Sequence, residues 1–151
     1  MLLALVQMAW DSVEGSGVLA QPVSEPYPTT IIQAGLGDVI VSAFSSEVLS
    51  RAFNASLLPN YARRVFGLNV LTRTSKNISI NVVLTEIMYE NEFKLLSTNN
   101  QIRNSPQNAI HVCLRRDAAI IQQIKEFVNN AKITNPCQQS KFDCQRSSVR
   151  C

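Results

Sequence analysis

The chain has 151 residues, of which 46% are hydrophobic and 17% charged, and its formal net charge is +3. This composition excludes a fully disordered chain and is typical of one globular domain that can bury a core of its own. A net charge this small does not indicate a nucleic-acid partner, and no apolar run approaches the roughly 18 residues of a spanning helix, so we expect no transmembrane segment.

Charge is distributed unevenly along the sequence. Residues 1–58 carry one basic side chain against five acidic ones, whereas residues 59–151 carry thirteen basic against six acidic. The asymmetry suggests that the second part meets an anionic partner, or that the two parts meet each other. A solvated basic face would explain it as well.

Residues 1–30 are predicted to be an N-terminal arm or linker, because residues 11–30 contain two glycines and three prolines. Residues 1–10 are apolar apart from Gln7 and are short enough for the core of a signal peptide. The basic region that precedes such a core is missing. A cleaved signal and a buried N-terminal strand or helix therefore both stay open.

The first predicted helix covers residues 38–54, with Asp38 as its cap. Its apolar side chains are expected to line one buried face: Val41, Phe44, Val48, Leu49, Ala52 and Phe53. After it, residues 60–66 could form a short second helix that Gly67 ends.

Strand patterns follow. Residues 68–74 form a probable first strand, and residues 78–89 form the clearest one, with apolar side chains alternating from Ile78 to Leu84. A shorter strand is expected at residues 93–97. The alternation of Ile110, Val112 and Leu114 predicts a last strand at residues 109–114.

A C-terminal amphipathic helix is predicted for residues 117–131, with Asp117 as the N-cap and apolar side chains at three- and four-residue spacing. The predicted fold class is therefore α+β: an antiparallel meander of three to four strands, within about residues 68–114, between an N-terminal helix and this one. Residues 31–131 would form the domain, and residues 132–151 a cysteine-bearing tail.

The segment from Val112 to Ile124 resembles the last strand and C-terminal helix of chemokines, and a three-stranded meander before it is also chemokine-like. The paired N-terminal cysteines of that family have no counterpart, because Cys113 is the first cysteine of this chain. The resemblance implies a chemokine-like signalling domain as a weaker alternative function.

The cysteines are the first candidates for chemistry: Cys113, Cys137, Cys144 and Cys151. Four cysteines allow three full disulfide connectivities, and their number and late clustering favour an oxidising compartment. We predict one bridge from Cys113 to a tail cysteine and intermolecular linkage through a remaining tail thiol. Four reduced thiols remain an alternative, as does a zinc site with His111, although the seven-residue spacing is not that of a zinc knuckle.

No catalytic, metal or cofactor site is predicted. His111 and Cys113 lie two apart on the expected strand, too far at the backbone for a catalytic pair, and Glu86, Glu90 and Glu92 are interpreted as a solvated turn. The Arg63-Arg64 and Arg115-Arg116 pairs could hold phosphates but have no accompanying motif.

Two glycosylation sequons begin at Asn54 and Asn77. Chance alone gives about this many sequons at this content of Asn, Ser and Thr, so they do not by themselves indicate secretion.

The sequence favours a non-enzymatic interaction or assembly protein, extracellular or in the secretory pathway, that binds a protein partner or itself. The alternative is a basic subunit of a cytosolic or viral nucleoprotein assembly, for which no nucleic-acid-binding motif is present.

Overall fold

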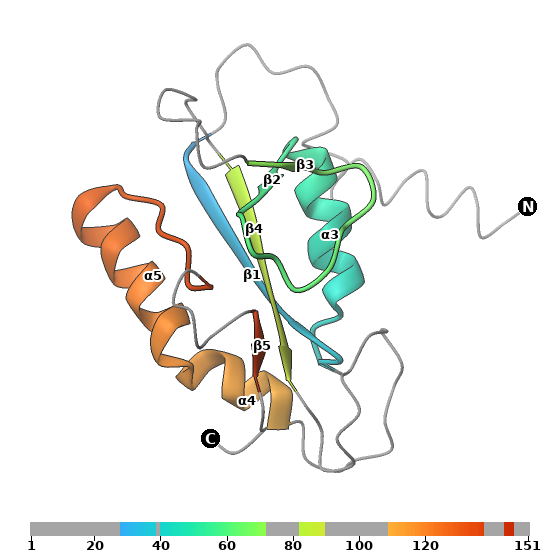
Figure 1. Cartoon of the computed structure of the whole chain (residues 1–151), viewed down its shortest axis with the longest axis vertical. Helices are drawn as coiled ribbons and strands as arrows, with labels where there is room; N and C mark the ends of the chain where they lie inside the picture. Colours follow the sequence, from blue (N-terminus) through green and yellow to red (C-terminus); the bar gives the residue numbers. More distant parts are fainter. Residues whose placement is uncertain (1–27, 39, 72–81, 90–108, 138–143, 147–151) are drawn as a thin grey trace, which may run out of the picture.

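The computed structural model describes residues 28–38, 40–71, 82–89, 109–137 and 144–146, and these form a sheet with helices on both of its faces (Figure 1). The elements in chain order are β1 (Thr30–Leu36), α3 (Ala43–Ala52), β2 (Ser56–Leu57), β3 (Asn69–Val70), β4 (Val82–Tyr89), α4 (Ala109–Arg116), α5 (Ala118–Asn130) and β5 (Gln145–Arg146).

The strands pair in parallel in the order β1-β4-β2-β3, with β5 also paired to β4. β1 lies along one edge of β4, with Ile32 opposite Leu84. β2 and β5 share the other edge: β2 pairs near the start of β4 and β5 at its end. The described sheet is therefore an α/β arrangement, and the predicted antiparallel α+β meander is wrong.

β4 is the centre of the sheet, and all eight of its residues are buried. Parallel strands are covered by helices on both faces, so they consist of nearly continuous apolar runs rather than alternating ones. The sequence Val82-Val83-Leu84 followed by Ile87-Met88-Tyr89 fits that rule. The predicted strand is confirmed over residues 82–89, and its earlier residues lie outside the described ones.

The two faces of β4 pack against different helices. Leu84 and Met88 face α3, together with Ile32 and Leu36 of β1. Ile87 and Tyr89 face the opposite side and pack with residues of α4, α5 and the tail: Ile110, Cys113, Ile120, Cys137 and Cys144. Burial of these two apolar clusters is the main favourable contribution to folding.

α3 begins later than predicted. Its N-cap is Ser42, whose hydroxyl accepts a hydrogen bond from the backbone N–H of Phe44, so the cap is not Asp38. Leu49 and Phe53 pack on the core as expected. Residues 60–66 form no helix; Gly67, at φ 81°, closes a turn there.

The predicted strand at residues 109–114 is wrong, because this segment is α4. Its most buried side chains are Ile110 and Cys113, with Leu114 half-buried, and this three- and four-residue spacing is helical. α4 packs closely on β1: a Cβ added at Gly35 would lie 2.8 Å from Ile110 Cγ2.

α5 confirms the predicted C-terminal helix. Asp117 is its N-cap and accepts hydrogen bonds from the backbone N–H groups of Ala119 and Ile120. Gln123, on the buried side of α5, reaches the sheet and bonds to Gln33 at 2.6 Å and to Thr85 at 3.1 Å. These polar contacts fix α5 against the face of the sheet opposite α3.

Several predictions lie outside the described residues. They are the strand at 93–97 and the first 27 residues of the arm predicted for 1–30, which include the possible signal segment. Residues 28–30 of that arm are described, and Thr30 begins β1. Within the described ranges, no helix has both the length and the apolar character that crossing a membrane requires. The chemokine-like reading needs an antiparallel meander followed by a strand at residues 112–114, and the parallel sheet and α4 contradict both.

Candidate functional site

Three large apolar side chains are exposed where β1 ends and α3 begins: Ile40 at 67%, Val41 at 50% and Phe44 at 56%. We call these three residues the apolar surface. Val41 and Phe44 were expected to line the buried face of the helix, and that expectation is wrong. Apolar side chains that gather on a surface are typical of contacts with another molecule.

Asp38 fixes the backbone that carries the apolar surface. Its buried carboxylate accepts hydrogen bonds through Oδ1 from the backbone N–H of Ile40 at 2.8 Å and of Val41 at 3.0 Å. A carboxylate that binds successive N–H groups holds a turn in one shape. The side chains of Ile40 and Val41 are therefore presented from an ordered turn.

His111 joins the same carboxylate to α4. Its Nδ1 lies 2.8 Å from Asp38 Oδ2. This contact is a hydrogen bond whenever Nδ1 carries a proton that it can donate. The pair sits just past the carboxyl end of β1, the edge of a parallel sheet where ligands bind in open α/β folds. The expected position of His111 beside Cys113 on a strand is wrong. Both residues lie on α4, and side chains two residues apart on a helix point in different directions.

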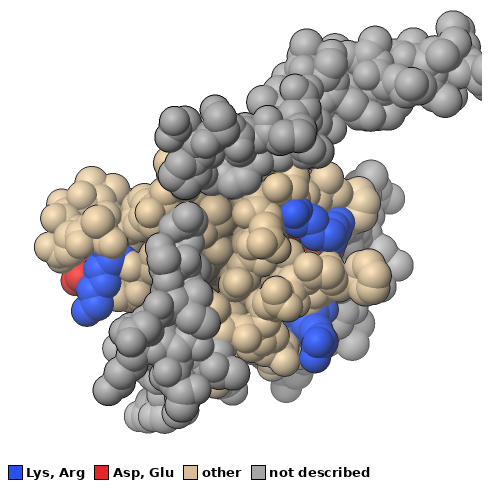
Figure 2. Space-filling view, turned by 90° about the horizontal axis from the view of Figure 1, so that it is seen from above, with Lys and Arg blue, Asp and Glu red and all other residues tan. Residues whose placement is uncertain are grey.

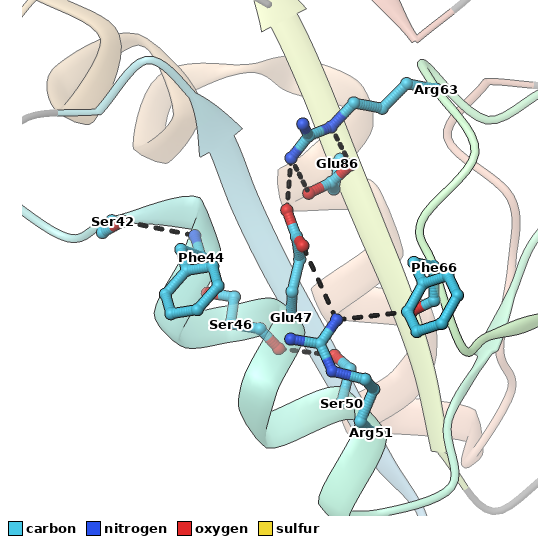
Figure 3. Close-up of polar contacts among 9 residues, drawn as sticks. All are labelled: Ser42, Phe44, Ser46, Glu47, Ser50, Arg51, Arg63, Phe66 and Glu86. Atoms are coloured by element: carbon cyan, nitrogen blue, oxygen red, sulfur yellow. Dashed lines mark hydrogen bonds and ion pairs between the residues drawn. The ribbon is translucent and has the colours of Figure 1, made fainter. Parts of the chain in front are cut away.

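A second polar group connects α3 to the sheet. Arg63, in the connection between β2 and β3, binds Glu86 of β4 through two nitrogens, Nε at 3.1 Å and Nη2 at 3.3 Å, and Nη2 also binds Glu47 of α3 (Figure 3). Arg51 extends the row, with its Nη1 3.7 Å from Glu47. We call these four residues the Glu86 cluster.

Glu86 is the buried member of that cluster, with a side chain only 1% exposed. Burial raises the pKa of its carboxyl above the ordinary value, and the Arg63 guanidinium only partly offsets this. The interpretation of Glu86 as part of a solvated turn is wrong, and Glu90 and Glu92 lie outside the described residues. Sequence reasoning also missed the pairing of Arg63, which was considered only for phosphate binding.

The Glu86 cluster connects three parts of the fold, namely α3, the β2–β3 connection and β4. Phe44, in the first turn of α3, points away from this row of charges (Figure 3). The charged side chains thus hold α3 on the sheet while its first turn carries Phe44 outward. The arrangement is suited to presenting a fixed apolar surface to a partner.

The tail contains a disulfide. Cys137 and Cys144 are joined, with their Cα atoms 5.1 Å apart. The carbonyl of Cys144 accepts a hydrogen bond from Met88 N at 2.7 Å, and Arg146 binds the carboxylate of Asp117 at 2.7 Å. This part of the tail is therefore attached both to the sheet and to the start of α5.

Cys113 is buried on α4, and none of the described cysteines has a free thiol. With Cys137 and Cys144 joined, Cys151 is the one cysteine left in the sequence that could pair with Cys113, and it lies outside the described residues. A bridge from Cys113 to the tail remains a prediction. The zinc reading loses two of its ligands to the disulfide, and no group of three possible metal ligands gathers among the residues described.

The two sequons differ in what the structure describes. Asn54 is exposed in the turn between α3 and β2, whereas Asn77 lies outside the described residues. The structure does not bring Asn54 near the cysteines: it follows α3, on the face of the sheet opposite α4.

Comparisons with known proteins find no match: no family model fits the chain, and neither the curated proteins nor the solved structures include a significantly similar one.

Proposed function

We propose that this chain is a non-enzymatic interaction protein, extracellular or in the secretory pathway, that associates with a second copy of itself through the apolar surface. The observation that supports this most is the exposure of Ile40, Val41 and Phe44 on a turn that Asp38 holds in place. Burying such side chains against a partner removes apolar area from water, which favours association.

Preorganisation of the apolar surface also favours association. A surface that is already ordered loses little conformational entropy on binding, so more of the burial energy is available for affinity. The Asp38 carboxylate orders the turn, and the Glu86 cluster anchors the helix behind it. A two-fold dimer would place the same surface of each copy against the other.

The oxidising location is supported by the Cys137–Cys144 disulfide, since such bonds persist mainly in secreted proteins and are rare in the cytosol. The nucleoprotein alternative has less support. On the face drawn in Figure 2 the Lys and Arg side chains of the described residues lie at separate places rather than in one patch, and Arg51, Arg63 and Arg146 each bind a carboxylate.

Sedimentation velocity of the full chain over a range of concentrations tests the proposal. We expect a reversible monomer–dimer equilibrium that Phe44→Ser weakens at least tenfold. The matched control is Val128→Ser, which also replaces an exposed apolar residue, 73% exposed on α5, but on the other face of the sheet. A chain that stays monomeric, or equal weakening by both variants, would contradict the proposed surface.

A further inference from the structure

Asn54 occupies an exposed turn whose backbone is hydrogen-bonded. Its φ of 51° is left-handed, and its backbone N–H bonds to the carbonyl of Arg51 at 3.0 Å. The next N–H, of Ala55, bonds to the carbonyl of Ser50 at 2.8 Å. These bonds fix the backbone on both sides of an exposed carboxamide.

The fold explains the asparagine of the sequence Asn54-Ala55-Ser56 but not the serine. Asn is among the residues that adopt a left-handed conformation most readily, so the turn itself favours it at position 54. Ser56 begins β2, and its hydroxyl makes no hydrogen bond to any residue in the described part of the chain. The Asn54 carboxamide likewise makes none there. A requirement for the sequon would account for Ser56.

We infer that Asn54 is a site of N-linked glycosylation, an inference that relies on the secretory location in the proposed function. The donor would be an oligosaccharide carried on a polyisoprenyl diphosphate. Nδ2 of Asn54 forms a bond to the anomeric carbon of the first sugar, and the bond from that carbon to the diphosphate oxygen breaks. The diphosphate leaves with the electron pair, the amide nitrogen gives up one proton, and nothing is oxidised or reduced.

A glycan at this position is compatible with self-association. Asn54 follows the C-terminal end of α3, whereas Phe44 lies in its first turn, so the two are about 15 Å apart along the helix at 1.5 Å per residue. The glycan would extend from the opposite end of α3 and leave the apolar surface open. It would also shield the turn between α3 and β2 from proteases.

The test is to express the full chain behind an added secretion signal in a eukaryotic host. Occupancy is read from gel mobility before and after peptide:N-glycosidase F, and from mass spectrometry of the tryptic peptide covering residues 52–63. Enzyme treatment should remove a mobility shift and leave Asp in place of Asn54. Asn77 falls in a different peptide, so its occupancy is scored separately.

Three variants test whether the modification depends on the acceptor sequence. Ser56→Ala and Asn54→Gly should abolish modification at position 54, and glycine keeps the left-handed turn. Ser56→Thr preserves the acceptor sequence and should retain the modification. The transfer occurs during translocation, so a variant that folds poorly still reports its occupancy.

An unmodified residue 54 in the translocated wild-type chain would overturn the inference, as would modification that persists in Ser56→Ala. Because the experiment supplies the secretion signal, failure at Asn54 leaves the proposed function standing. A wild-type chain that stays monomeric in the sedimentation experiment would contradict the proposed function without affecting this site.

Discussion

Glu86 and Asp38 are the two buried charged residues in the described parts of the chain. A carboxylate removed from water is costly unless a cation and hydrogen-bond donors surround it, and Arg63 supplies both to Glu86. Glu47, on the other side of the same guanidinium, adds a second negative charge that Arg63 must balance. The guanidinium of Arg63 therefore balances the buried charge of Glu86 and also binds Glu47.

Replacing Arg63 with Met keeps the apolar stem and removes the guanidinium. We expect the free energy of unfolding to fall by about 3 kcal/mol, because a buried ion pair that loses one partner leaves an uncompensated charge. Urea unfolding measures the loss. Adding Glu86→Gln to Arg63→Met should recover part of it, and a double variant that is less stable than the single one would contradict the pairing.

The raised pKa of Glu86 also predicts a pH dependence. The folded state holds this proton more tightly than the unfolded state, whose carboxyl titrates near the ordinary value of 4.5. Its contribution to stability is therefore fully present below that value and is lost as pH rises through the folded pKa. Compared with Glu86→Gln, the wild-type chain should lose stability from pH 4 toward neutral pH. A constant difference between the two over this range would contradict a raised pKa.

Among the contacts between elements, the packing of α4 on β1 was not predicted from the sequence. Gly35 lies opposite Ile87 in the register and faces α4, and a side chain there would collide with Ile110. The absence of a Cβ at this position allows the helix to approach the strand closely.

Gly35→Ala should destabilise the fold by about 1–3 kcal/mol, the usual cost of overpacking a filled core. Thermal unfolding would show this as a decrease in Tm of several degrees. Ile110→Ala removes the colliding methyl group, so the double variant should lose less than the two single losses added together. Simple additivity would indicate that α4 does not pack on Gly35.

Residues 109–114 show why part of the fold could not be predicted from the sequence. Ile110, Val112 and Leu114 alternate as in a strand, and Cys113 gives the same segment a helical spacing from Ile110. A short apolar stretch satisfies both periods, and only the packing of α4 on β1 decides between them. The segment 118–130 is long, and its apolar residues recur at regular helical spacing, so α5 and its Asp117 cap were predictable.

The parallel pairing of the strands could have been predicted from the sequence. The alternation at residues 78–84 favoured an antiparallel strand with one exposed face, but residues 82–89 are apolar on both faces, apart from Thr85 and Glu86. A run of that kind indicates a strand covered on both sides, hence a parallel sheet. The Glu86 cluster could not be predicted, because Glu47 and Arg63 meet Glu86 only through tertiary contacts.

At the scale of the whole molecule, the tail forms part of the structure through β5 and the Cys137–Cys144 disulfide. The Arg146–Asp117 ion pair attaches it to α5, and Cys137 and Cys144 are buried among residues of α4 and α5. β5 of the tail thereby lies beside the end of β4, paired with Met88 and Tyr89.

Replacing both Cys137 and Cys144 with Ala should cost about 2 kcal/mol, which is what chain entropy gives for a loop this short. Denaturant unfolding of the variant, with the wild-type chain under non-reducing conditions as the control, measures the difference. If removing the bond leaves the midpoint unchanged, the tail does not stabilise the fold through this link.

Hydroxyl-radical footprinting of the full chain, at concentrations below and above those at which it associates, tests whether the apolar surface is the site of self-association. Phe44 belongs to the apolar surface, and Phe127, half-buried on α5, is an aromatic control on the other face. Self-association through the apolar surface predicts that oxidation of Phe44 slows as the chain associates while oxidation of Phe127 stays constant. An unchanged rate at Phe44 in samples that sediment as dimers would contradict it.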